Sequence, residues 1–362
     1  MIVRTRWLGR LFGILALWAS VAITSQAETK PVRGIDLPTV RVGIDLWPGY
    51  YPVVIAQQRG LFRQRGLRVK YSLPENTDKM LEEFVAGKLD VICVAMGDVL
   101  ALKSRLPSLR VALISDESNG GDALVSLKPL PKNLKGLRIG TNLNGFGELF
   151  VRAFLEQKGV PLKDITLVNL EASNARVMLE QGKVDIAHTW EPYVSELTSY
   201  DDATVVFSSA QTPGLIPDAV VFRGDLLQRQ ALARAFVSGW LEAVNWWKAH
   251  RREGYTLVER ALVMMPGTVN LEGIRLFDAD DNRRMFQRGD NMQSIYFVAR
   301  KYIDFFTEKG LLKTGMTPDD LLDPDMLPPV AGSDAISGLP PAAGTDLQSG
   351  VPASKCGTST HC

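Results

Sequence analysis

A pattern of strands and helices occurs twice in this chain, and it constrains the fold more than any single motif. Residues 41–95 read as strand, loop, helix, strand, helix and strand, and residues 136–193 repeat that order. The third strand of each copy follows a helix that ends at a glycine. We expect Thr77 or Asp78 to cap that helix in the first copy, and the helix of "SNARVMLEQGK" to be capped in the second. Three residue pairs recur there at a spacing of 95: Gly87 and Gly182, Lys88 and Lys183, and Asp90 and Asp185. Agreement over a whole element order indicates two duplicated lobes rather than a short solenoid repeat.

Strands that alternate with helices predict an α/β fold with parallel sheets covered by helices on both faces. In such lobes ligands bind beyond the carboxyl ends of the strands. The loop "WPGYYP" follows the first strand of the first copy, and "NLNGFG" holds the same place in the second. The third strands end at "MGD" and "TWEPY". If the lobes face each other, these four loops converge on one cleft.

Two stretches suit the crossings between the lobes. Residues 119–136 and 208–224 each combine a short strand with a turn rich in Pro or Gly. We therefore expect residues 39–125 and 211–330 to form lobe 1, residues 126–210 to form lobe 2, and two hinge strands to join them. The part from 211 onward is expected to be mostly helical. Apolar side chains at helical spacing there, from Leu232 to Trp247, are expected in the core.

The two ends of the chain differ in composition from the globular part. Arg4, Arg6 and Arg10 precede the apolar stretch "LFGILALWASVAI", and small residues at Ser25 and Ala27 suit cleavage after Ala27. Residues 1–27 are therefore predicted to be a cleaved signal peptide for export to the periplasm, with an uncleaved anchor as the alternative. Residues 331–362 are rich in Gly, Pro, Ser and Ala without a hydrophobic period, which predicts a disordered tail.

The three cysteines give no clear site. Cys93 lies in an apolar run and is expected to be a small buried hydrophobe. Cys356 and Cys362 could pair in an oxidising compartment, and His361 lies beside them. Their spacing matches no standard zinc site, so no metal or cofactor is expected.

Enzyme motifs are incomplete. "GFGELF" lacks the third glycine of a dinucleotide loop, and neither a Walker A loop nor a G-x-S-x-G elbow occurs. "DADDNR" begins like a calcium loop, but Arg283 and Gly289 stand where Gly and Glu are required, so a helix cap or a loop is the better interpretation. A formal net charge of +1 without a basic block gives no indication of a nucleic-acid partner.

Several stretches together resemble the nitrate-, sulfonate- and taurine-type solute-binding proteins of ABC importers, a group that includes binders of thiamine-pyrimidine precursors. The stretches are "DLWPGYYPVVIAQQRGLF", "FVAGKLDVICVAMGD", "LKGLRIGTNLNGFGELFVRAFLEQKGV", "LEQGKVDIAHTWEPY" and "YIDFFTEKGLL". The resemblance covers roughly residues 39–328. It implies a type II periplasmic-binding-protein fold, closure around a small solute, and delivery to an ABC permease and its ATPase by a monomer.

The resemblance also implies which positions bind the solute. They are the first loop, the end of the third strand, the start of the second-lobe helix and the "WEP" turn. In this chain they are Trp47, Tyr50, Tyr51, Met96, Gly97, Asp98, Asn142, Asn144, Gly145, Phe146, His188, Trp190 and Glu191, and the hinge regions add Asp116 and Asp218. Aromatic rings can stack on a ligand, and helix N-termini offer free N–H groups to an oxyanion. Each position also has a structural alternative: Trp47 in the lobe core, His188 as a satisfied strand-end histidine, and Glu191 at a helix start.

The candidate cleft residues include few Lys or Arg but several acids: Asp45, Asp98, Asp116, Glu117, Glu191 and Asp218. A bare anion such as nitrate would favour a cation in the cleft. The acidic excess therefore favours the hypothesis of a ligand with a positive or hydrogen-bond-donating nitrogen, such as an amino-sulfonate or an aminopyrimidine.

Two functions compete with import. A periplasmic sensor for a membrane receptor would use the same closure. An enzyme related to the fungal pyrimidine synthase of thiamine biosynthesis would need a cofactor lysine, an essential histidine and a cysteine-rich motif. Because the chain has an apparent export signal and no cysteine cluster, we expect no enzymatic activity.

Overall fold

The structure is a computed structural model that describes residues 36–199 and 202–329. The predicted signal peptide 1–27 and the predicted tail 331–362, with Cys356, His361 and Cys362, lie outside the described residues. From Leu37 onward the chain forms one unit, and all that follows concerns that unit.

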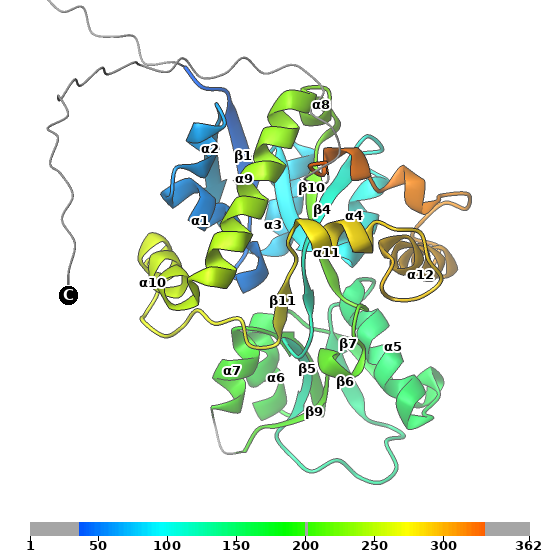
Figure 1. Cartoon of the computed structure of the whole chain (residues 1–362). Coiled ribbons are helices and arrows are strands. Elements are labelled where there is room, and N and C mark those ends of the chain that lie inside the picture. The colour runs from blue at the N-terminus through cyan, green and yellow to red at the C-terminus, as the bar shows by residue number, and fades with distance from the viewer. Residues whose placement is uncertain (1–35, 200–201, 330–362) are drawn as a thin grey trace, which may run out of the picture. The chain divides into compact units, whose positions relative to one another are not determined.

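The described strands form two sheets, which lie one above the other in Figure 1. The first sheet has the order β11-β4-β10-β3-β1-β2 and the second has the order β7-β6-β8-β5-β9. The strands are β1 (Thr39–Gly43), β2 (Arg68–Ser72), β3 (Val91–Ala95), β4 (Arg110–Ser118), β5 (Asp122–Ser126), β6 (Arg138–Thr141), β7 (Thr166–Asn169), β8 (Ile186–Trp190), β9 (Thr204–Ser208), β10 (Pro217–Phe222) and β11 (Ile274–Leu276). The predicted α/β class with two lobes is confirmed.

The sequence repeat has a structural counterpart. In the first sheet β1 runs parallel to β2 and β3, and in the second β6 runs parallel to β7 and β8. One antiparallel strand follows in each, β10 beside β3 and β5 beside β8. The two lobes thus share a strand order as well as a sequence pattern.

The repeated aspartate makes the same ion pair in both lobes. Asp90 accepts hydrogen bonds from the backbone N–H and the guanidinium of Arg41, with the Nη2–Oδ1 distance at 2.6 Å. Asp185 accepts the same set from Arg138, with that distance at 2.7 Å. Each pair joins the first strand of a lobe to the residue that precedes the third strand. This contact gives a physical reason for the recurring Asp.

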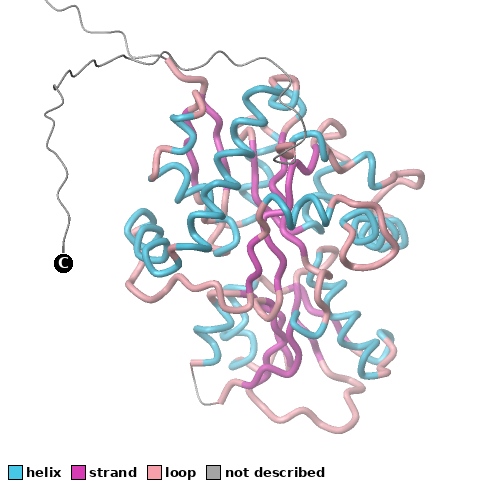
Figure 2. Tube along the Cα trace, in the orientation of Figure 1, coloured by secondary structure: helices cyan, strands magenta, loops and turns pink. Residues whose placement is uncertain are grey.

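The chain passes between the sheets twice, from β4 to β5 and from β9 to β10 (Figure 2). Ser118 ends β4 in the first sheet and Asp122 begins β5 in the second, so the first crossing lies at residues 119–121, slightly before the expected boundary at 125. The hydroxyls of Ser118 and Ser209 lie 2.7 Å apart and join the two crossings. Strand β4 was not predicted from the sequence.

Helices cover both sheets (Figure 1). They are α1 (Pro52–Gln58), α2 (Leu61–Gln64), α3 (Thr77–Val85), α4 (Met96–Lys103), α5 (Phe146–Lys158), α6 (Ala175–Glu180), α7 (Tyr193–Thr198), α8 (Gly224–Leu227), α9 (Gln230–Ala249), α10 (Arg251–Leu262), α11 (Ala279–Met285) and α12 (Ile295–Glu308). The predicted core face of α9 is confirmed, since Phe236, Trp240, Val244 and Trp247 are fully buried, whereas Leu232 is half-buried. Cys93 is fully buried in β3, as predicted.

Local corrections concern helix starts. Asn76 caps α3 through its side chain, whereas Thr77 or Asp78 was expected. Gly60, whose φ is 71°, ends the first helix α1 before α2 begins. The residue before α6, Asn174, makes no side-chain cap. The acidic stretch "DADDNR" is a helix cap, because Asp278 and Asp281 form a capping box at the start of α11.

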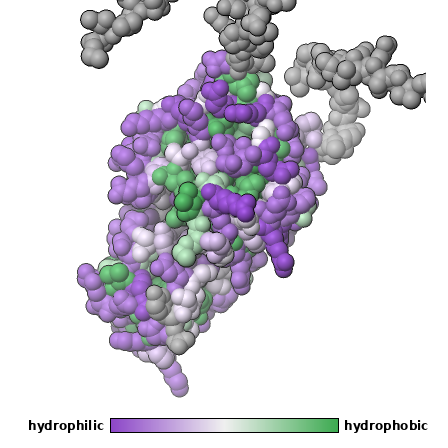
Figure 3. Space-filling view, turned by 90° about the vertical axis from the view of Figure 1, so that its left-hand side faces the viewer, coloured by the Kyte–Doolittle hydropathy of each residue, from purple (hydrophilic) through white to green (hydrophobic). Residues whose placement is uncertain are grey.

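The molecular surface seen in Figure 3 is mainly hydrophilic, with hydrophobic side chains in small separate groups. No helix within the described ranges is long and apolar enough to span a membrane.

Candidate ligand-binding site

A small cavity lies between the two sheets, beside the crossing strands. Its volume is about 40 Å³ for the centres of water-sized molecules, enough for a few waters or a very small solute. Both lobes contribute to its lining. The lining residues are Asp45, Trp47, Tyr50, Thr77, Val94, Ala95, Asp98, Asp122, Asn142, Phe146, Glu171, Trp190, Ile216 and Asp218. We refer to it as the aromatic cavity, after the four rings of Trp47, Tyr50, Phe146 and Trp190.

Two rings come from the loop after β1 and are held by the crossing strands. The indole N–H of Trp47 donates to Asp116 Oδ1 at 2.8 Å, and the hydroxyl of Tyr50 donates to Asp218. Gly49 lies between the rings in a 3₁₀ turn, Pro48–Tyr50. A side chain at Gly49 would place its Cβ 2.0 Å from Asp116 Oδ2, so only glycine fits. The aromatic turn is therefore built around the carboxylates of the hinge.

These hinge carboxylates lie close together. Asp116 on β4 and Asp218 on β10 are directly opposite each other in the antiparallel register, and both are buried. Burial raises the pKa of Asp116 to about 7, despite hydrogen bonds from Ser115 and Trp47. Burial, and then the charge of Asp116, raise the pKa of Asp218 well above its ordinary value. Near neutral pH the pair therefore holds a proton.

Two further aspartates face the cavity from lobe 1. Asp45 accepts a hydrogen bond from the Trp47 backbone N–H at 3.0 Å, and burial raises its pKa to about 6. Asp98 lies in the first turn of α4 and accepts no hydrogen bond from the part of the chain that the structure describes. Burial raises its pKa to about 7, and the charge of Asp45 adds to this.

Lobe 2 supplies the opposite wall. The rings of Phe146 and Trp190 pack with centroids 5.5 Å apart. Behind them lies His188, whose Nε2 is 3.1 Å from Asp122 Oδ1 and whose Nδ1 is 3.1 Å from Thr141 Oγ1. A Cβ at Gly147 would lie 2.6 Å from His188 Nδ1, so glycine lets α5 approach this histidine. His188 therefore supports Asp122 and the rings from behind, and it does not line the cavity.

The starts of α4 and α5 meet across the lobes. A Cβ at Gly97 would lie 2.7 Å from the backbone nitrogen of Phe146. The absence of a side chain at Gly97 thus permits the close approach that narrows the cavity on this side.

Seven of the predicted residues line the aromatic cavity: Trp47, Tyr50, Asp98, Asn142, Phe146, Trp190 and Asp218. Asp116 and His188 hold lining residues from behind, and Gly97 makes the contact between helix starts. Whether any of them contacts a solute stays a prediction.

The remaining predicted residues lie elsewhere, for identifiable reasons. Tyr51 is buried in the lobe 1 core and its hydroxyl donates to the Leu46 carbonyl at 2.8 Å. Met96 is fully buried in the core, and Gly145 is the N-cap of α5. Asn144 is exposed, with its N–H donating to Glu148. Glu191 accepts hydrogen bonds from the Ser195 N–H and hydroxyl at the start of α7. This agrees with the alternative that Glu191 lies at a helix start.

Other lining residues were not in the predicted site set. They are Asp45, Thr77, Val94, Ala95, Asp122, Glu171 and Ile216. Asp45 was considered only as a contributor of charge. Asp122 could have been found from the sequence, because it is the acid at the start of a strand that follows the turn "NGG".

A second space of about 230 Å³, which we call the vestibule, adjoins the aromatic cavity. Asp45, Thr77, Glu171 and Trp190 line both spaces, and Glu75 joins them in the vestibule. The shared residues place the vestibule beside the rings, and we expect a small molecule to approach them from this side.

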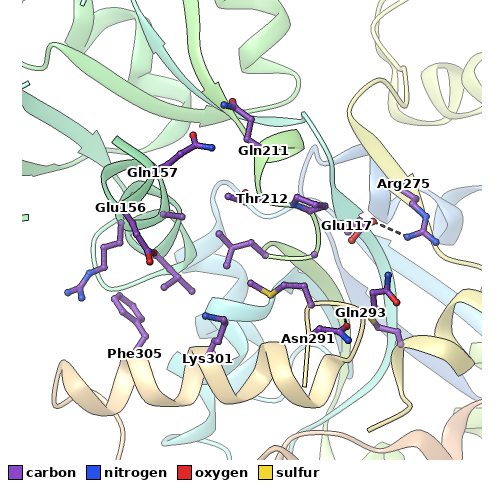
Figure 4. Close-up of a pocket in the computed structure, with 18 of the residues that line it drawn as sticks. Glu117, Glu156, Gln157, Gln211, Thr212, Arg275, Asn291, Gln293, Lys301 and Phe305 are labelled. Atoms are coloured by element: carbon purple, nitrogen blue, oxygen red, sulfur yellow. Dashed lines mark hydrogen bonds and ion pairs between the residues drawn. The ribbon is translucent and has the colours of Figure 1, made fainter. Parts of the chain in front are cut away.

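A larger crevice of about 1290 Å³ lies on the other face of the hinge (Figure 4). Neighbouring residues of β4 point to opposite faces, so Asp116 supports the aromatic cavity whereas Glu117 lines the crevice. Glu156 and Gln157 of α5 lie on one side of it, and Lys301 and Phe305 of α12 on another.

The ionic groups of this crevice largely satisfy one another. Arg275 bonds Glu117 at 3.0 Å and Asp281 at 2.8 Å, and Arg284 also bonds Asp281. The crevice is larger, but the aromatic cavity combines rings from both lobes with several carboxylates, of which Asp98 accepts no hydrogen bond from the described residues, so we take the aromatic cavity as the candidate site.

Comparison with known proteins identifies the family. The model of the family described as "NMT1/THI5 like" matches residues 47–253, more than half of the chain. The chain belongs to the NMT1/THI5-like family. The resemblance found in the sequence is thereby confirmed.

Two curated relatives differ in the activity their names state. The chain is 30% identical over 142 residues, 38% of its length, to 4-amino-5-hydroxymethyl-2-methylpyrimidine phosphate synthase THI13 of Saccharomyces cerevisiae. It spans only 41% of that protein. It is 26% identical over 257 residues, 68% of its length, to a putative aliphatic sulfonates-binding protein of Bacillus subtilis, of which it covers 76%.

A solved structure shows the fold. The periplasmic aliphatic sulphonate binding protein SsuA of Escherichia coli superimposes with a TM-score of 0.63 at 16% identity, over 79% of this chain and 97% of that one. The expected fold of the periplasmic binding proteins is therefore confirmed.

Proposed function

We propose that this chain is the solute-binding component of an ABC importer, which captures a small molecule in the aromatic cavity and delivers it to a permease. The observation that carries the proposal is the convergence of rings from both lobes, Trp47 and Tyr50 facing Phe146 and Trp190, beside both crossing strands. A cavity built by two lobes about a hinge changes shape when the lobes move, so binding is coupled to a form that a permease can recognise.

Export follows from the same proposal. The apparent signal peptide at residues 1–27 supports a periplasmic location, and the sulfonate-binding relatives support a permease with its ATPase as partners. A monomer and the absence of a nucleic-acid partner complete the proposal.

A synthase is a weaker candidate. The described lining of the aromatic cavity holds no Lys, His or Cys, the residue types that such an enzyme was expected to need. A sensor that reports the same solute to a membrane receptor shares the binding step, and genes for a permease and an ATPase beside this gene would favour import.

A thermal-shift screen tests the binding step. The protein is heated with nitrate, small sulfonates, amines and pyrimidines, and a ligand at a hundredfold excess over its Kd stabilises the folded state by about 2.7 kcal/mol. We expect at least one solute to raise the melting temperature and to reduce the radius of gyration in solution scattering. If no solute stabilises the protein or changes its scattering, solute capture is refuted.

A further inference from the structure

The aromatic cavity is lined by acids without any basic partner. Its described lining includes five carboxylic side chains and no Lys, Arg or His: Asp45, Asp98, Asp122, Glu171 and Asp218. Carboxylates that share a small, poorly hydrated space repel each other and lose hydration. A positive group among them would relieve both costs.

Two of these carboxylates have oxygen atoms to offer. Asp122 is 2% exposed, and His188 engages its Oδ1 while no residue in the described ranges bonds its Oδ2. Asp98 has no hydrogen-bond donor among the described residues. Carboxylate oxygens that line a cavity without a donor from the protein are open to donors on a ligand.

The vestibule carries the same charge. Asp45, Glu75 and Glu171 line it, again without a Lys or Arg among the described residues. An entrance of one sign concentrates ligands of the opposite sign and raises their association rate.

The rings set the shape of the ligand. Trp47 and Tyr50 line the cavity from lobe 1, Phe146 and Trp190 line it from lobe 2, and a flat molecule can stack on such rings. The faces of Trp and Tyr also attract cations directly.

We propose that the aromatic cavity takes a planar organic cation, whose N–H groups donate to Asp98 and Asp122. This inference rests on the proposed function, because it names the class of solute for the same cavity. It sets the chain apart from its relatives named for sulfonates, since a sulfonate would meet five carboxylic side chains and no Lys, Arg or His in the described lining.

The test uses two series of probes that differ in charge and little in shape. Guanidinium, urea and nitrate are planar molecules of four heavy atoms, with one positive, zero and one negative charge. Benzamidinium, benzamide and benzenesulfonate form the larger series. Each probe is titrated into the full chain by calorimetry at millimolar concentrations of the probe. At best, a ligand of four heavy atoms binds with a Kd of roughly tens of micromolar.

We expect the cation of at least one series to bind about tenfold or more tightly than its neutral counterpart, with no binding of the anion. Asp98→Asn should weaken the cation about tenfold and leave the neutral probe unchanged. Asp122→Asn is a second variant, and Glu156→Gln in the crevice behind the hinge is the matched control with no effect.

The inference is overturned if an anion binds more tightly than the cation of its series, or if neither cation binds. It is also overturned if both aspartate variants bind the cation as tightly as the parent protein does. Binding of nitrate or benzenesulfonate would leave the proposed capture of solutes intact. Failure of every solute in the wider thermal-shift screen would remove that proposal as well.

Discussion

Asp116 and Asp218 face each other across the antiparallel hinge strands β4 and β10, and each holds one ring of the aromatic turn, Trp47 and Tyr50 respectively. Like charges directly opposite in a sheet are unfavourable, so this pair is stable near neutral pH only with a proton or a cation nearby. The hinge, the rings and the acidity of the site are therefore parts of one arrangement.

The aspartates of the aromatic cavity should make the ligand-free protein less stable as the pH rises. Burial raises the pKa of Asp98 to about 7, above its value near 4 in the unfolded chain. Its contribution to stability is therefore fully present below pH 4 and is lost as the pH rises to about 7. Asp98→Asn should increase the free energy of unfolding at pH 8 by about 1.4 kcal/mol per unit of pKa shift removed, and should not change it at pH 4.

Urea unfolding at both pH values measures this difference. Asp290→Asn, in the exposed loop after α11, is the control and should change neither value. A variant Asp98→Asn that is no more stable than the parent protein at pH 8 would show that the carboxylate is well solvated.

Trp47→Phe should reduce the free energy of unfolding by more than a Trp→Phe replacement at the surface does. The ring is kept, but Asp116 loses the indole N–H that bonds it at 2.8 Å, and a buried acceptor without its donor costs about 1–3 kcal/mol. Urea unfolding at pH 8 should show this loss, and the solute found by thermal shift should bind more weakly. Trp246→Phe, which keeps the half-buried ring stacked on His250, should leave both unchanged. Equal effects of the two variants would argue against the Trp47–Asp116 bond as a support of the site.

The repeated ion pairs offer a comparison between the lobes. The side chain of Asp90 is 7% exposed and that of Asp185 is 32% exposed. Asp90→Asn should therefore reduce the free energy of unfolding more than Asp185→Asn, by about 1–3 kcal/mol against about 1 kcal/mol or less. Chemical denaturation at pH 7 and two salt concentrations measures both. The opposite order, or no loss in either, would mean that these pairs do not stabilise the strands they join.

Gly97→Ala should keep the starts of α4 and α5, and with them the two lobes, farther apart. The added Cβ would come within 2.7 Å of the Phe146 backbone nitrogen, where no flexible side chain can yield. We expect a larger radius of gyration in the presence of solute and at least tenfold weaker binding, about 1.4 kcal/mol, with chemical denaturation little changed. Ala101→Ser, on the exposed face of α4, is the control. If the radius of gyration and the affinity for the solute stay unchanged, the starts of α4 and α5 can move apart without a cost in binding free energy.

The sequence predicted the two lobes and the two ring-bearing loops because those signals are local. A helix that ends at Gly182 and a strand that follows it are visible in a short window. Asp116 and Asp218 were predicted as site residues, but Asp122 was not, and the arrangement of the three is not visible in a short window because strands far apart in the chain bring them together. Only pairing across the crossings places them beside one cavity.

Neighbouring aromatic residues show the other limit. Tyr50 and Tyr51 are adjacent and chemically identical, yet Tyr50 lines the cavity and Tyr51 packs in the lobe core. The 3₁₀ turn Pro48–Tyr50 decides which ring faces inward, and its geometry depends on the fit of Gly49 against Asp116. A sequence pattern cannot resolve that choice.

The most direct measurement is a crystal structure of the protein grown with the tightest solute of the screen. The account predicts solute density in the aromatic cavity, in contact with Trp47 and Trp190 from opposite lobes. Density confined to the crevice behind the hinge, with the aromatic cavity unchanged, would contradict it.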